Sequence, residues 1–207
     1  MYNDFNLHFS YYLVISHVNV NSLVNKVSYI KNVISECCVD VLGISETWLN
    51  DEIYNSIVDV HGYDIIRSDS PSGRRKHGVC VYVRNNIKYE ELNWLVPNVT
   101  LLYLPDYGLY IVIVYRPPSN NNIDNIENQV LINFLTEFCN NKEVLIMGDF
   151  NLPSLDWSSD SMLSNYISPT DLEFLNTFTA LGLEQLIRIP TNFPVMYYNR
   201  FMFKFRP

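Results

Sequence analysis

The chain has 207 residues, of which 48% are hydrophobic, and this is enough for one large domain with a buried core. Charged residues make up 17%, which excludes a disordered composition, and no apolar run reaches the length of a bilayer span, so no membrane partner is expected. The net charge of −8 argues against a protein that binds nucleic acid through a broad, positively charged surface. It does not exclude a nuclease, whose site must be acidic to hold a metal.

The N-terminal segment and the cysteines bear on the compartment. The segment has no basic stretch and no small-residue cleavage site, so we do not expect a signal peptide. The four cysteines form no C-x-x-C pair, which argues against a zinc site. We therefore expect an intracellular protein with reduced thiols, nuclear if it is functional.

The first half of the chain predicts three strands and one helix. Residues 11–18 are strand-like, and Ser22 is a candidate N-cap for the helix that follows. Two more short apolar strands are predicted at 39–45 and 78–84. The helix after Ser22 is predicted from the helical spacing of four apolar residues, Val24, Val27, Ile30 and Ile34.

The second half alternates strands and helices. Residues 109–115 ("LYIVIVY") are apolar enough for a central strand, and a further buried strand is expected at 143–147. A helix is predicted at 126–139, and a capping box at Thr170–Glu173 opens another that ends at Gly182. Strands this apolar must be covered on both faces, so the pattern predicts an α/β domain with packed sheets. The inward positions of the helix at 126–139 are Val130, Phe134, Leu135 and Phe138.

Polar side chains follow the predicted strands, and strand ends that lead into loops are where a rigid scaffold displays catalytic groups. Oxygen ligands of the kind that Mg²⁺ prefers are available from Glu46, Asn19 and Asp149, and a metal there would neutralise charge on a phosphate ester. A tyrosine hydroxyl and an asparagine amide can orient the phosphate. The full set at the strand exits is Asn19, Asn21, Glu46, Tyr115, Asp149 and Asn151.

Each of these residues also has an ordinary structural explanation. Asp149 and Asn151 follow a glycine and suit a turn, and Glu46 taken alone is typical of a surface carboxylate. Tyr115 precedes a rigid Arg-Pro-Pro segment, and the two asparagines after the first strand could cap a helix. Individually the ordinary explanation is favoured, and only the joint occurrence in one order indicates a site.

Five segments occur along the chain in a characteristic order, and three of them contain "ETWL", "YRPP" and "GDFN". The order resembles the endonuclease/exonuclease/phosphatase superfamily. It is most similar to the endonuclease domain of non-LTR retrotransposons, a group related to the abasic-site endonucleases. The five segments are "NVNSLVNK", "DVLGISETWL", "HGVCVYVR", "IVYRPPS" and "EVLIMGDFNLPSLDW".

The resemblance implies a fold and a cofactor. The fold is a four-layer α/β/β/α sandwich, with the domain at 11–192 and a divergent tail at 193–207. The cofactor is Mg²⁺, with Mn²⁺ as an alternative, bound by Glu46 with Asn19 nearby. It also implies DNA as the partner and a reverse transcriptase in the parent polyprotein.

The resemblance further implies catalytic roles. Tyr115 would contact the scissile phosphate, and Asp149 and Asn151 would position the attacking water and the phosphate. Asn21 is a weaker candidate, because many relatives carry an acidic or small residue at its position.

The C-terminus departs from the family pattern, which continues with an Asp on a strand after "PT" and then a Ser-Asp-His element. Here no histidine follows Asp149 and the last aspartate is Asp171, so no general-base histidine is assigned and the last strands are expected to be missing. The segment 193–207 is either a foreign tail, the interpretation we favour, or a strand. The strand would rest on the alternation of Phe201, Phe203 and Phe205.

The sequence therefore predicts a Mg²⁺-dependent DNA-nicking endonuclease of retrotransposon origin, impaired by the loss of those closing elements. The alternative is a non-catalytic remnant that keeps the fold only. Whether the chain is an enzyme is left open at this point.

Overall fold

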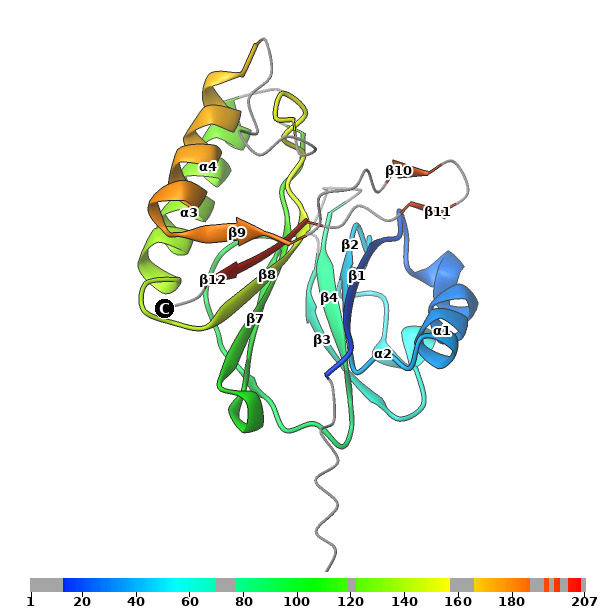
Figure 1. Ribbon diagram of the computed structural model, residues 1–207. Coiled ribbons are helices and arrows are strands. Elements are labelled where there is room, and N and C mark those ends of the chain that lie inside the picture. Colours follow the sequence, from blue (N-terminus) through cyan, green and yellow to red (C-terminus); the bar gives the residue numbers. More distant parts are fainter. Residues whose placement is uncertain are drawn as a thin grey trace, which may run out of the picture.

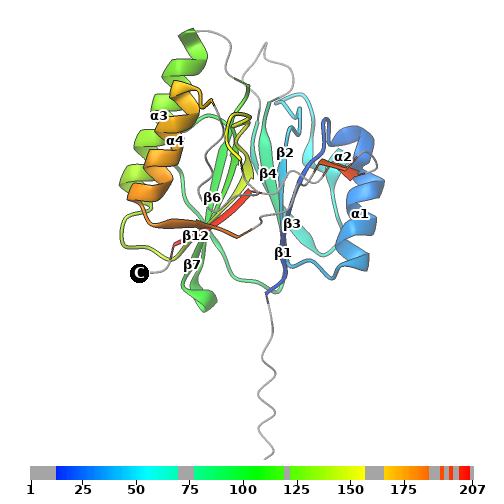
Figure 2. The same ribbon diagram turned by 45° about the horizontal axis from the view of Figure 1, so that its top comes forward.

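Two β-sheets lie face to face, and helices cover the outer face of each (Figure 1). The first sheet has the strand order β1-β2-β4-β3, and the second has the order β5-β6-β7-β8-β12-β9. In this computed structural model α1 and α2 cover the first sheet, while α3 and α4 lie side by side on the second (Figure 2). The described residues are 13–69, 77–118, 122–156, 166–186, 192–193, 196–197 and 201–205.

The first sheet and its helices come from the first half of the chain. The edge strand β1 is parallel to β2, and β4 lies antiparallel between β2 and β3. The elements are β1 (Ile15–Asn19), a 3₁₀ turn η1 (Val24–Lys26), α1 (Val27–Glu36), β2 (Val41–Ser45), α2 (Asn55–Val58), β3 (Tyr63–Ser68) and β4 (Val79–Arg84).

The chain from Glu90 onward forms the second sheet, whose central pair, β7 and β8, is parallel, and a separate two-stranded sheet of β10 and β11. The elements are β5 (Glu90–Glu91), β6 (Val99–Leu104), η2 (Pro105–Tyr107), β7 (Leu109–Tyr115), α3 (Asn122–Phe138), β8 (Val144–Asp149), α4 (Pro169–Ala180), β9 (Leu183–Gln185), β10 (Asn192–Phe193), β11 (Met196–Tyr197) and β12 (Phe201–Phe205).

The buried side chains form three clusters, one for each contact between adjacent layers. On β4, Val79, Val81 and Val83 face the other sheet, whereas Cys80 and Tyr82 face the outer helices. Strands covered on both faces need apolar residues at every position, and this explains the continuous hydrophobic runs. The predicted α/β sandwich of packed sheets is confirmed.

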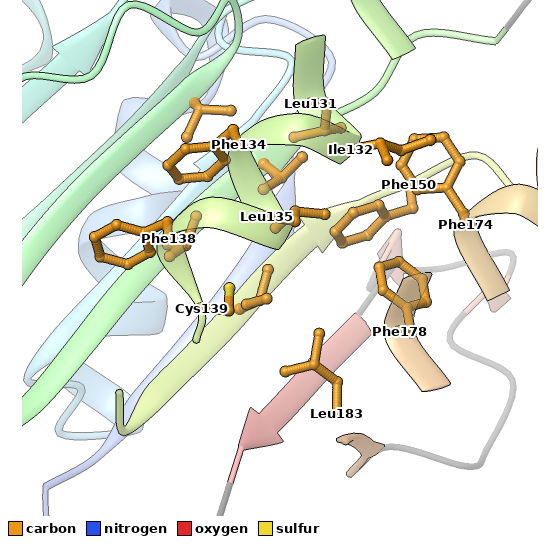
Figure 3. Close-up of a cluster of buried hydrophobic side chains, with 14 of the residues drawn as sticks. Leu131, Ile132, Phe134, Leu135, Phe138, Cys139, Phe150, Phe174, Phe178 and Leu183 are labelled. Atoms are coloured by element: carbon orange, nitrogen blue, oxygen red, sulfur yellow. The ribbon is translucent and has the colours of Figure 1, made fainter. Parts of the chain in front are cut away.

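The helix side of the second sheet is rich in phenylalanine (Figure 3). Phe150, directly after β8, is fully buried, with its ring centroid 5.4 Å from that of Phe178 and 6.3 Å from that of Phe174. Both partners come from α4. Phe150 therefore anchors the turn after β8 and fixes the residues on either side of it.

The first helix is capped differently from the prediction. Ile30 and Ile34 are buried as expected, but the Ser22 hydroxyl accepts a hydrogen bond from Asn25 Nδ2 at 3.2 Å, and neither η1 nor α1 has a side-chain cap. Val24 is partly exposed, at 38%. The helix is stabilised by its buried face, as is common for short helices in proteins.

Two other helical details differ from the sequence analysis. The N-cap of α4 is Ser168, whose hydroxyl accepts from the backbone N–H three residues later, so the capping box placed at Thr170 is two residues late. Pro169 explains the shift, because proline suits the first helical position. In α3, Val130 is 37% exposed and Leu131 is buried, so the buried face is turned by one residue.

The C-terminal segment pairs with the second sheet. β12 is antiparallel to β8 on one side and to β9 on the other. Of the two interpretations of residues 193–207, the one with a pairing strand at Phe201–Phe205 is observed, and this strand lies between β8 and β9, in the part of the sheet where strands were expected to be missing. Among the described helices, none combines the length and apolar character needed to cross a bilayer.

Candidate active site

The predicted site residues lie at the ends of the parallel strand pair in each of the two sheets. Tyr115 ends β7 and Asp149 ends β8, and the two are register partners in a parallel pair. Asn19 ends β1 beside Ser45 of β2, and Glu46 is the next residue. Parallel strands exit at the same edge of a sheet, so each pair delivers its polar residues together.

The Asn19 side chain links the two sheets. Its Nδ2 donates to Glu46 Oε1 at 2.7 Å and to Asp149 Oδ2 at 3.0 Å. Its Oδ1 accepts from the backbone N–H of Asn21 at 3.1 Å, and this fixes which end of the amide faces the carboxylates. Two carboxylates from different sheets therefore converge on one amide, and Asp149 is only 3% exposed.

The backbone at these strand exits is strained. Glu46, Trp48 and Asn151 have φ of 54°, 57° and 47°, and Asn21 and Ser22 have φ of 45° and 87°. Side-chain-bearing residues in this left-handed region cost about 1–3 kcal/mol each and cluster at functional sites. Asparagine adopts this region readily in ordinary turns, so the positive φ values of Glu46 and Trp48 are the ones that favour the functional interpretation of the exits.

Tyr115 faces the carboxylates from within the core between the sheets, at 5% exposure. Burial raises the pKa of its phenol, and so do the negative charges of Glu46 and Asp149 and a side-chain hydrogen bond to Glu46. The phenol is therefore neutral at physiological pH and available as a donor.

Asn151 and Arg116 hold the turn after β8. Asn151 donates from its backbone N–H to Asp149 Oδ1 at 3.1 Å and from Nδ2 to the Arg116 carbonyl at 2.8 Å. The Arg116 guanidinium donates to the Phe150 and Asn151 carbonyls and, from Nε, to Asn128 Oδ1 at 2.8 Å. Arg116 was not predicted as a site residue, although it lies within the "YRPP" segment.

Two further residues complete the geometry. Asn21 joins the site through its backbone N–H, while its side chain is exposed. His77, which the sequence analysis did not assign to a site, lies beside Tyr115, with ring centroids 5.8 Å apart and ring planes at 86°. It lies in the "HGVCVYVR" segment, but its position follows from pairing between β2 and β4, which is not readable from the motif.

The donor set suits a hard divalent cation. Glu46 and Asp149 supply carboxylate oxygens, while the Asn19 amide presents its NH₂ to both of them and turns its oxygen to the Asn21 N–H. No group of three or more His, Cys, Asp or Glu side chains with metal-binding geometry occurs in the described ranges. Mg²⁺ needs no such group, because it is usually bound by one or two carboxylates and keeps several waters. A cation would also offset the repulsion of two carboxylates that share one amide.

Comparison with known proteins now decides the family. The sequence model of the Endonuclease/Exonuclease/phosphatase family matches residues 16–202. The chain belongs to this family. The resemblance inferred from the motifs is thereby confirmed at the level of the superfamily, and no curated protein matches the chain significantly.

Solved structures of similar fold include two AP endonucleases and an exonuclease. The AP endonuclease from Archaeoglobus fulgidus matches with a TM-score of 0.70 at 15% identity, over 93% of this chain and 86% of that one. The 3'-5' exonuclease NExo from Neisseria meningitidis matches at 0.67 and 17% identity, over 92% and 86%. The AP endonuclease from Leishmania major matches at 0.67 and 14% identity, over 92% and 78%. At these identities the match supports the four-layer fold, and the roles of individual residues stay predictions.

Proposed function

We propose that this chain is a Mg²⁺-dependent endonuclease that nicks DNA. The observation that carries the proposal is the Asn19 amide, which bridges Glu46 and Asp149 from different sheets at 2.7 Å and 3.0 Å. A buried and a half-buried carboxylate beside a neutral tyrosine suit a bound cation and a phosphate ester. One similar structure, the 3' phosphatase NExo from Neisseria, was solved with a product DNA hairpin.

Each site residue has a proposed role in hydrolysis that follows from its position. Glu46 would hold Mg²⁺, with its carboxylate oriented by the nearby Asn19 NH₂, and the cation would neutralise charge that develops on the phosphate. The Tyr115 phenol would donate to a phosphate oxygen, since its raised pKa keeps the proton in place. Asp149 would accept a hydrogen bond from the attacking water and so orient it. Asn151 fixes the turn that presents Asp149.

We expect this 207-residue chain to hydrolyse DNA weakly. It contains no histidine after Asp149, where the family pattern has its Ser-Asp-His element. Loss of a general acid or base lowers a rate by about 10²–10⁴-fold. The same observation supports a second candidate, a folded but non-catalytic remnant.

A retrotransposon origin is part of the proposal. It is supported by the order of "ETWL", "YRPP" and "GDFN" along the chain. In that setting the domain would act in the nucleus, with a reverse transcriptase as part of the same polyprotein. A reverse-transcriptase reading frame in the neighbouring genomic DNA would support this origin, and an unrelated gene there would contradict it.

The test is nicking of supercoiled plasmid by the purified chain in Mg²⁺, with EDTA and Asp149→Asn as negative controls. Glu137→Gln is the matched control, because it removes a carboxylate from the exposed face of α3. Nicking that is lost in EDTA and in Asp149→Asn but kept in Glu137→Gln would support the proposal. A cooperatively melting wild-type protein that does not nick would leave the remnant as the correct description.

A further inference from the structure

Asn98 joins the two sheets at the edge where the candidate site lies. It precedes β6, is 2% exposed and has a left-handed φ of 56°. Its backbone carbonyl accepts from the Tyr115 N–H at 2.9 Å, in the second sheet. Its side-chain Oδ1 accepts from the Gly78 N–H at 3.0 Å, just before β4 of the first sheet. This buried asparagine therefore joins the end of β7 in the second sheet to the start of β4 in the first.

The same asparagine sets the protonation of His77. Because Oδ1 is committed to Gly78, the amide NH₂ is the end that lies 3.2 Å from His77 Nδ1. An amide NH₂ only donates, so Nδ1 has to accept, and the ring proton resides on Nε2. Asn98 therefore selects the tautomer in which His77 Nε2–H is a hydrogen-bond donor.

His77 is also tied to the metal-binding strand exit through its backbone. The His77 carbonyl accepts from the Trp48 N–H at 2.9 Å, and the Gly78 carbonyl accepts from the Thr47 N–H at 3.1 Å. These bonds continue the β2–β4 pairing past the end of β2, beside Glu46. On the other side the half-buried imidazole meets the Tyr115 ring edge to face.

We propose that His77 is a catalytic residue of this site, which donates a hydrogen bond from Nε2–H to a non-bridging oxygen of the phosphate that Tyr115 contacts. Asn98 is the residue that positions it. The proposal rests on the proposed function, because it assumes a phosphate ester at this site. An imidazole whose Nδ1 accepts from Asn98 presents a donor and not a base at Nε2, so His77 does not replace the general-base histidine that the family pattern places after Asp149.

Two substitutions separate this role from simple packing against Tyr115. In His77→Gln the amide nitrogen lies near the position of Nε2, whereas in His77→Asn it lies near that of Nδ1. We expect His77→Gln to keep most of the wild-type kcat for plasmid nicking. We expect kcat of His77→Asn to fall by about 10²-fold, as when one donor to a developing oxyanion is removed. Equal losses in the two variants, or no loss in either, would overturn the proposal.

The tautomer can be measured without activity. In the two-bond ¹⁵N–¹H spectrum of the histidine-labelled wild-type protein, we expect His77 to be protonated at Nε2 alone, and Asn98→Ala to lose this preference. A proton on Nδ1 in the wild type would overturn the proposal.

If the wild-type chain does not nick, the proposed function fails, and binding of a fluorescent DNA duplex in EDTA still tests His77. Weaker binding by His77→Asn than by His77→Gln would support the contact with phosphate. Identical dissociation constants would refute it. Thermal melting of both variants verifies that each is folded.

Discussion

Replacing Asn19 with aspartate tests whether the amide holds two carboxylates together. The substitution is isosteric, but it replaces the amide that donates to Glu46 and Asp149, at 2.7 Å and 3.0 Å, with a third carboxylate. Two like charges about 4 Å apart repel by about 4 kcal/mol at an effective dielectric constant of about 20. Movement of the exposed side of the site relieves part of this, so we expect a loss of about 2–4 kcal/mol in the free energy of unfolding.

Thermal unfolding followed by circular dichroism measures the effect. For a chain of this size a loss of 1 kcal/mol lowers Tm by about 2–4 °C, so Asn19→Asp should melt about 4–16 °C below wild type in EDTA. Mg²⁺ should restore much of the difference, because a cation that binds only the folded state stabilises it by mass action. Asn133→Asp on the exposed face of α3 is the matched control. If Asn19→Asp melted with the wild type in EDTA, or did not respond to Mg²⁺, the geometry inferred for the site would be wrong.

Three further substitutions follow from the same geometry. Phe150→Ala should lower the free energy of unfolding by about 3–5 kcal/mol in urea titrations, whereas Tyr54→Ala, which removes an exposed ring, should be near neutral. In Arg116→Lys the ammonium group cannot donate to Asn128 and to both backbone carbonyls at once, so the free energy of unfolding should fall by about 2–4 kcal/mol. Unchanged stability would contradict the role of Arg116 in holding this turn. Tyr115→Phe should slow nicking. Above about pH 10 the unfolded wild type loses a proton at Tyr115 that the folded state keeps, so wild-type stability should fall with pH more steeply there than that of Tyr115→Phe.

Much of the fold was predictable because its strands are buried on both faces. The strand at Leu109–Tyr115 has the predicted bounds, since seven consecutive apolar or aromatic residues leave little alternative. β6 was not predicted, although Val99–Leu104 is almost as apolar, because no flanking motif drew attention to it. Helix faces were read less well, since a one-residue rotation exchanges Val130 with Leu131 without changing the sequence pattern.

The site was predictable as a set of residue types and not as a network. Position at a strand exit is a local property, and it identified Asn19, Glu46, Tyr115 and Asp149. Contacts such as the one between Asn19 and Asp149 join residues 130 positions apart, and no local pattern encodes them. Asn98 and His77 escaped for the same reason, because their importance lies in which sheet each one reaches.

The hydrogen bonds that Asn19 makes to both sheets bear on the opening fluctuations of the protein. A fluctuation that parts the two sheets would disrupt the proposed cation site in the same event, because the two carboxylates that meet there, Glu46 and Asp149, come from different sheets. A bound cation should therefore slow hydrogen exchange at amides on β2 and on β8 together, whereas a site built on one hairpin would protect only its own strands. A substitution that destabilises either sheet, even far from the two carboxylates, should therefore weaken the affinity for the cation. If the proposed cation binds there, cation binding and the cooperative folding of the two sheets would be lost together.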